Sequence, residues 1–129
     1  MKVTVIIPQL PKMANSGRGW NWRVDWADKK RWYEIMSLRM KQYRPVEPLQ
    51  ELAVTLTRCS SKEPDFDGLV HGFKPVVDSL VRLGFVINDR MSNLKATYKW
   101  EPSPRNKGFI RIEMELPDPP KAHISDMTC

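Results

Sequence analysis

Residues 49–84 read LQELAVTLTRCSSKEPDFDGLVHGFKPVVDSLVRLG, and the spacing of the apolar side chains changes partway through this stretch. Over 49–58, Leu52, Val54 and Leu56 alternate with polar or small residues, as in a half-buried strand. After the polar loop SSKEPDFD, apolar residues recur at the steps of three and four that are typical of a helix: Leu69, Phe73, Val76, Leu80 and Leu83. The stretch therefore predicts a strand followed by an amphipathic helix.

Pro75 lies inside this helical pattern. Proline lacks a backbone N–H, and its ring clashes with the preceding turn of a helix. We therefore expect a kink, or a helix that becomes regular only after Lys74. Gly84 follows the last apolar residue, and glycine commonly ends a helix at that position.

The preceding segments add a strand and a helix. The β-branched residues over 2–7 (KVTVII) predict a strand, and the prolines and glycines over 8–21 predict a loop. A helix is expected over 25–43, stopped by Pro45. Its apolar stripe would consist of Trp26, Tyr33, Met36, Met40 and Tyr43.

Two more strands are predicted near the C-terminus, where apolar residues alternate over 93–100 and 110–116. The loop EPSPRNKG between them is expected to form a hairpin. The tail over 117–129 has no periodicity and is expected to be disordered. The order βαβαββ predicts a single small α+β domain over 1–116, with one mixed sheet packed by two helices.

Charge and cysteine content narrow the class of protein. The chain has 129 residues, and 21 Lys and Arg against 15 Asp and Glu give a net charge of +6, which favours a polyanionic partner. Cys59 and Cys129 form neither a disulfide framework nor a zinc-ligand spacing. No apolar run approaches the roughly 20 residues of a membrane span, or resembles a signal peptide. These features predict a soluble, reduced, cytoplasmic protein with no membrane partner.

Three aspartates are candidates for binding a divalent cation. Asp65 and Asp67 are two residues apart, so in an extended segment their carboxylates point the same way. Asp89 follows the helix, and the chain reversal could return a third carboxylate to the first two. Magnesium prefers such oxygen ligands. The alternative is that Asp65 or Asp67 caps a helix and Asp89 is a turn residue.

Lys74 would share the polar face of the helix with Asp67, His71 and Asp78. A lysine beside a carboxylate-bound metal could hold the scissile phosphate or stabilise charge that develops on it. The alternative is a solvated helix face with ion pairs between residues four apart. His71 could act as a base, but magnesium does not favour imidazole, and His123 lies in the tail.

Basic and aromatic residues are concentrated over 18–32: Arg18, Trp20, Trp22, Arg23, Trp26, Lys29, Lys30, Arg31 and Trp32. Arginine and lysine can clamp phosphates, and exposed tryptophans can stack on unpaired bases. We predict that Arg18, Arg23 and Lys30 face DNA. Trp26 is expected in the core, and at least one of the other three tryptophans could be there as well.

The segment 65–89 resembles the signature of the RusA-like Holliday junction resolvases. Many members, especially phage-borne ones, carry Asp-x-Asp-Asn-Leu, a lysine, Asp-x-Leu, a glycine and Asp-Asp. The matching residues here are Asp65, Asp67, Leu69, Lys74, Asp78, Leu80, Gly84 and Asp89. A weaker resemblance, in element order and in the N-terminal prolines, extends over 3–116. The compact, divergent motif favours a phage or prophage origin.

This resemblance implies a crossover junction endodeoxyribonuclease that acts in DNA recombination and repair. Such enzymes are homodimers that need Mg²⁺, for which Mn²⁺ is a substitute, and they nick two strands of a four-way junction symmetrically. Asp65, Asp67 and Asp89 would be the metal ligands, and Lys74 the catalytic lysine.

Two residues depart from the family pattern. Gly68 replaces the usual asparagine, and Asn88 replaces the first aspartate of the final pair. These departures keep open a catalytically impaired protein that binds junctions or forks without cutting them. A metal nuclease that acts on other branched DNA, and a basic structural protein, are further alternatives.

Overall fold

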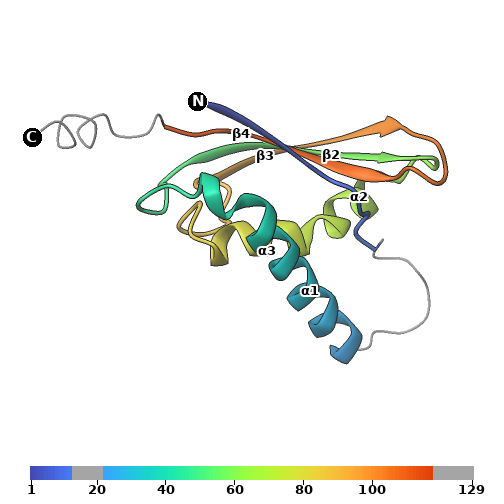
Figure 1. Ribbon diagram of the computed structural model, residues 1–129, viewed down its shortest axis with the longest axis horizontal. Helices are drawn as coiled ribbons and strands as arrows, with labels where there is room; N and C mark the ends of the chain where they lie inside the picture. The colour runs from blue at the N-terminus through green and yellow to red at the C-terminus, as the bar shows by residue number, and fades with distance from the viewer. Residues whose placement is uncertain (13–21, 118–129) are drawn as a thin grey trace, which may run out of the picture.

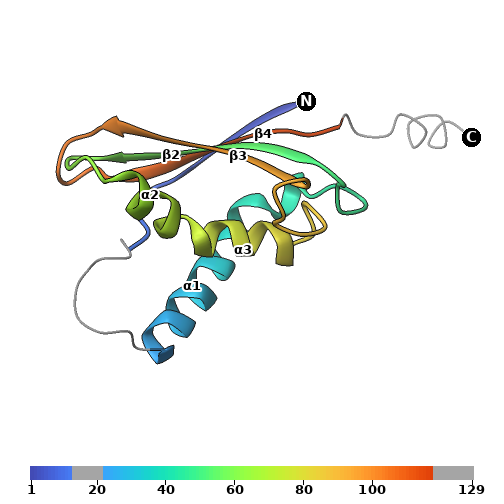
Figure 2. The same cartoon turned by 180° about the vertical axis from the view of Figure 1, so that it is seen from behind.

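The structure is a computed structural model that describes residues 1–12 and 22–117. Within the second range, side chains are described from Trp26 onward. The elements in chain order are β1 (Lys2–Ile7), α1 (Trp22–Met40), a 3₁₀ turn η1 (Lys41–Tyr43), β2 (Leu52–Ser60), α2 (Phe66–Gly72), α3 (Lys74–Arg82), β3 (Leu94–Pro102) and β4 (Phe109–Glu115). The helices all lie on one face of the sheet (Figures 1 and 2). The predicted α+β class, with helices packed on a small mixed sheet, is confirmed.

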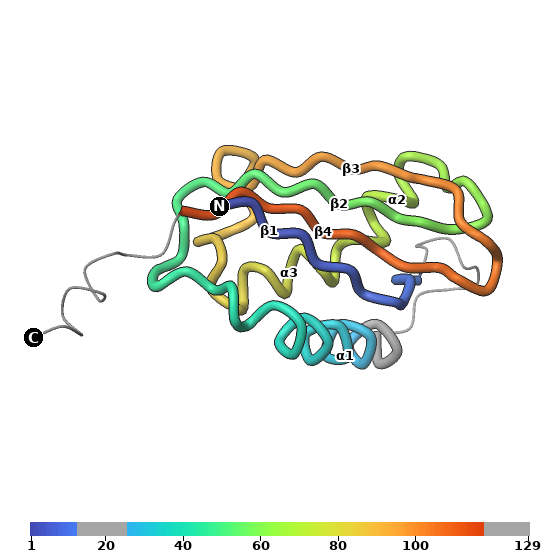
Figure 3. Tube along the Cα trace, turned by 45° about the horizontal axis from the view of Figure 1, so that its top comes forward, coloured from blue at the N-terminus to red at the C-terminus, as the bar shows by residue number. Residues whose placement is uncertain are grey.

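The four strands have the order β1-β4-β2-β3 (Figure 3). β4 is antiparallel to both β1 and β2, whereas β2 and β3 are parallel. The predicted hairpin is therefore wrong, because β2 lies between β3 and β4. Strands two positions apart are separated by about 10 Å, so the loop over 103–108 crosses the end of β2 instead of making a tight turn. Side-chain alternation specifies a buried face but not a neighbouring strand.

The core lies between the sheet and the helices. Val3, Val5 and Ile7 of β1 are buried on this inner face, and they pair in register with Met114, Ile112 and Ile110 of β4. β2 continues the same layer with Leu52, Val54 and Leu56, as its alternation predicts. The strand expected over 49–58 starts later and ends at Ser60.

Helix α1 begins and ends about three residues earlier than expected, and η1 continues it to Tyr43. Trp26 is 62% exposed, so its predicted place in the core is wrong. Trp32 is buried instead, at 2% exposure. With Met36 and Met40, which follow at steps of four, it forms the buried stripe of α1. The start of α1 points away from the sheet (Figure 2).

The second predicted helix is two helices, α2 and α3, that meet at Phe73. Pro75 occupies the first turn of α3, where the missing N–H costs no helical hydrogen bond. The break expected around Lys74 is therefore confirmed. Gly84 has φ +88°, a left-handed conformation that suits glycine at a helix end. None of the described helices is long and apolar enough to cross a membrane.

The predicted disordered tail lies outside the described residues from 118 onward.

Candidate functional site

Lys74 joins two segments that are distant along the chain. Its Nζ atom lies 2.9 Å from Oδ2 of Asp89 and 3.1 Å from Oδ1 of Asp78. The contact with Asp78 is an ion pair between residues four apart on a helix, as the alternative interpretation of this helix face predicted. The contact with Asp89 brings the loop after α3 back to the first turn of that helix. We call these three residues the Lys74 cluster.

The two principal charges of the cluster stabilise each other. The hydrogen bond to Asp89 raises the pKa of Lys74, and the same bond lowers the pKa of the Asp89 carboxyl. The lysine is thus an ammonium and the aspartate a carboxylate at neutral pH. Their side chains are 53% and 43% exposed, and such exposed pairs contribute only about 0.2–1 kcal/mol. A ligand can therefore replace either partner at little cost.

Asp65 is the N-cap of α2, as one of the alternatives predicted. Its Oδ1 atom accepts a hydrogen bond from the backbone N–H of Gly68 at 3.0 Å, which leaves Oδ2 for another partner. Asp67 lies in the first turn of the same helix, and both side chains are exposed. The strand–loop–helix sequence thus places two carboxylates at the start of α2.

The donor chemistry of the three aspartates fits Mg²⁺, which is often held by one or two carboxylates together with substrate phosphate. Among the residues that the structure describes, no three His, Cys, Asp or Glu side chains gather closely enough to hold a metal ion. Asp89 contacts Lys74, and Asp65 contacts the α2 backbone. Joint metal binding by Asp65, Asp67 and Asp89 stays a prediction.

Tyr98 is a site residue that the sequence did not single out. Its ring contacts Phe73, with 6.0 Å between centroids. Burial raises the pKa of its hydroxyl, on which the charges of Lys74 and Asp89 act in opposite directions. Through its contact with Phe73, the neighbour of Lys74 in sequence, Tyr98 lies near the Lys74 cluster. The parallel pairing of β3 with β2 puts it there, and side-chain alternation does not predict that pairing.

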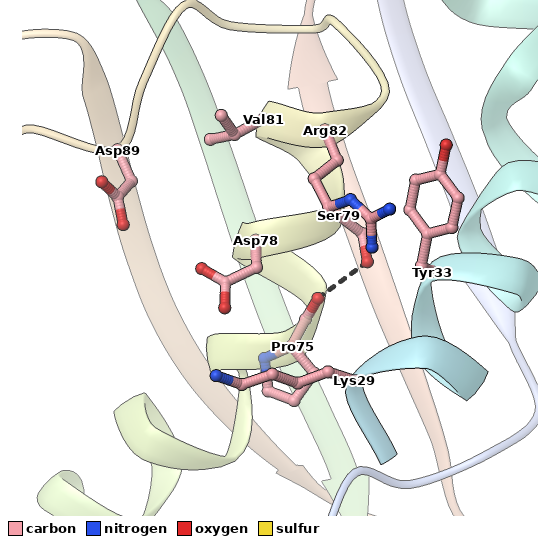
Figure 4. A pocket seen from close by; sticks show the side chains of 8 residues that line it. All are labelled: Lys29, Tyr33, Pro75, Asp78, Ser79, Val81, Arg82 and Asp89. Atoms are coloured by element: carbon pink, nitrogen blue, oxygen red, sulfur yellow. Dashed lines mark hydrogen bonds between the residues drawn. The ribbon is translucent and has the colours of Figure 1, made fainter. Parts of the chain in front are cut away.

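A pocket of about 290 Å³ adjoins the cluster, between α1 and α3 (Figure 4). Asp78 and Asp89 line it together with Lys29 of α1. The guanidinium of Arg82 stacks 4.0 Å from the ring centre of Tyr33, which fixes another wall. The pocket therefore combines carboxylates from the candidate site with basic groups from two helices.

The predicted DNA-facing residues are only partly described. Arg18 lies outside the described residues, and so does the side chain of Arg23, which belongs to α1. Lys30 is exposed, and its Nζ atom lies 5.5 Å from the ring centre of Trp26. An exposed cation beside an exposed indole suits contact with nucleic acid, although it equally suits bulk solvent.

His71 is exposed in the last turn of α2, whereas His123 lies outside the described residues. Gly68 is a buried residue of α2, and its backbone N–H donates the hydrogen bond to the Asp65 carboxylate. The Oδ1 atom of Asn88 accepts a hydrogen bond from the backbone N–H of Arg90 at 2.9 Å. Asn88 thus orders the loop that carries Asp89.

Neither the comparison with models of known protein families nor the search among curated proteins finds a match for this chain.

Proposed function

We propose that the chain is a Mg²⁺-dependent endodeoxyribonuclease that resolves four-way DNA junctions by paired nicks. One observation carries the proposal. Lys74 and Asp89, two residues that the RusA-like motif specifies, are 15 positions apart in sequence and meet at 2.9 Å on an open surface. Both side chains are about half exposed, so a phosphate and a cation can reach them.

The candidate residues have distinct roles in this proposal. Asp65, Asp67 and Asp89 would hold the ion, which when bound polarises the scissile phosphate and lowers the pKa of an attacking water. The Lys74 ammonium offsets the negative charge that grows on the phosphate oxygens. The Tyr98 hydroxyl, near Lys74, can donate a hydrogen bond to the same group.

Surface features support a nucleic acid as the substrate. The net charge of +6 favours polyanions. Phe66 lies between Asp65 and Asp67 in sequence and is 69% exposed, so its ring is available to stack on an unpaired base. Because a four-way junction has two equivalent strands to cut, a homodimer with two identical sites matches it by symmetry.

The test is incubation of the purified protein with an end-labelled four-way junction and with linear duplex of the same sequence, with and without Mg²⁺. We expect symmetric nicks in the junction alone, and only with the metal. If the linear duplex were cut at the same rate as the junction, the assignment of four-way junctions as the substrate would be wrong. Flaps and forks in the same assay identify a metal nuclease that prefers other branched DNA.

A second candidate function is binding to junctions or forks without cutting. The hydrogen bond from Arg90 to Asn88 favours it, because the side chain at this departure from the motif is engaged within its own loop. Junction binding with no nicks at any Mg²⁺ or Mn²⁺ concentration would put this function first.

A further inference from the structure

A second concave surface lies at the end of the sheet where β2 finishes. The β2–α2 loop, the β3–β4 loop and the segment after β1 converge there (Figure 3). They enclose about 360 Å³, and three cationic residues line the space: Arg58, Lys62 and Arg105. We call this surface the basic hollow. Asp65, the N-cap of α2, lies on its wall, so the hollow adjoins the candidate metal site.

The three cations have no anionic partner in the part of the chain that the structure describes. Arg58 is partly buried, and it donates one hydrogen bond, from Nη1 to the backbone oxygen of Pro11 at 2.8 Å. A guanidinium has five N–H donors, so most of its capacity is unused. A half-buried cation without a counterion costs free energy, which an anionic ligand would recover. Glu63 and Asp65 also line the hollow, so it is not uniformly basic.

The hollow is walled by closely packed groups. Leu10 covers Gly108, and a Cβ atom at that position would overlap the leucine side chain. The hydrogen bond of Arg58 to Pro11 fixes the same segment from the other side. At the base, the Ser60 hydroxyl accepts a hydrogen bond from the indole N–H of Trp100 at 3.0 Å. These contacts fix the positions of groups that line the hollow.

We propose that the basic hollow binds the phosphodiester backbone of a DNA strand, next to the phosphate that is cut. A strand whose phosphate contacts Lys62 and Arg105 would pass Asp65 as it leaves the hollow. The hollow would then set the direction of the strand across the candidate site. The position of the cut phosphate rests on the proposed nuclease function, whereas backbone binding by the hollow does not.

The test compares two double variants that remove the same charge from opposite faces. Lys62→Gln with Arg105→Gln removes two of the three positive charges that line the hollow. Lys95→Gln with Lys99→Gln is the matched control, because both of these lysines are exposed on β3, on the face away from the helices. Binding of a four-way junction is measured by fluorescence anisotropy in EDTA over a series of salt concentrations.

We expect the hollow variant to bind DNA more weakly and to lose about 0.9 from the slope of log affinity against log salt for each phosphate contact removed. The control should keep the wild-type slope. Equal slopes and affinities in the two variants would overturn the proposal. Calorimetry with inorganic phosphate separates the two sources of the anion: loss of phosphate binding with unchanged DNA affinity would also overturn it.

Nicking by the wild-type protein in Mg²⁺ separates this proposal from the nuclease assignment. If the hollow variant alone loses DNA affinity and the wild type does not nick, the hollow is upheld and the nuclease is excluded. If the wild type nicks the junction and the hollow variant behaves like the control, the nuclease stands and the hollow fails.

Discussion

Two ion-pair clusters on opposite faces of the sheet have similar contact lengths but different surroundings. On the face away from the helices, Arg111 forms a bidentate pair with Glu101, at 3.0 and 3.1 Å. On the helical side, Lys74 forms contacts of nearly the same lengths with Asp89 and Asp78. Distances alone do not separate a structural pair from a functional one.

The two pairs differ in the residues that they cover. Arg111 lies opposite Thr57 and Glu101 opposite Cys59, so their bridge crosses β2 and covers two residues that are at most 1% exposed. The Lys74 cluster instead borders a pocket and lies near the Tyr98 hydroxyl. The comparison indicates that Arg111 protects the sheet and that Lys74 is available to a ligand.

The largest effect is expected at Asp67. Asp67→Asn removes a predicted metal ligand and introduces no clash, so it should abolish junction cutting and leave junction binding intact. Cutting is measured with end-labelled junction, and binding by gel shift in EDTA. Asp28→Asn on α1 is the matched control and should cut normally. Wild-type cutting by Asp67→Asn would make the metal assignment wrong.

A smaller loss is expected at Tyr98. Tyr98→Phe keeps the ring against Phe73 and removes only the hydroxyl. Since a hydrogen bond to a charged group contributes about 1.5 kcal/mol or more, cutting should slow by roughly tenfold with an unchanged Tm. An unchanged cutting rate would show that the hydroxyl does not contact the phosphate.

On the other face, Arg111→Met should lower the Tm and uncover Cys59. Burial raises the pKa of the Cys59 thiol, so in the wild type it should react slowly with iodoacetamide. We expect faster labelling at Cys59 in the variant, located by mass spectrometry, with junction cutting retained. Labelling of Cys59 at the same rate in both proteins would show that the Arg111 bridge does not protect the strand.

The smallest effect is expected at Lys30. Lys30→Ala should weaken binding to all DNA about equally and reduce the salt slope by about one. Anisotropy titrations with junction and duplex check both. A slope equal to that of the wild type would place Lys30 away from DNA.

The sequence predicted the positions of the helices and strands better than it predicted which of them lie side by side. Alternation and helical spacing located the strands and helices because both depend on local burial. The same alternation could not show that β2 separates β3 from β4. Nor could the stripe of α1 show that Trp26 is exposed, since periodicity carries no information on how far the neighbouring layer extends.

For the candidate site, too, the sequence predicted residues within one local motif but not those brought in from other strands and loops. The motif identified Lys74 and Asp89, which the fold brings together. Tyr98 and the cations of the basic hollow were missed, because they reach their places through the strand order and through two loops. The cap formed by Asp65 was one of the open alternatives, and its contact with Gly68 could not be predicted from the sequence alone.

The most direct test of the account is the nicking rate of Lys74→Met measured beside that of Arg111→Met, at saturating Mg²⁺ and at a temperature where both variants are folded. We predict that Lys74→Met cuts the four-way junction about 100-fold more slowly than the wild type, the scale expected when a group that stabilises transition-state charge is lost. Arg111→Met should cut at the wild-type rate. Equal rates for the two variants would contradict the assignment of the Lys74 cluster as the functional one.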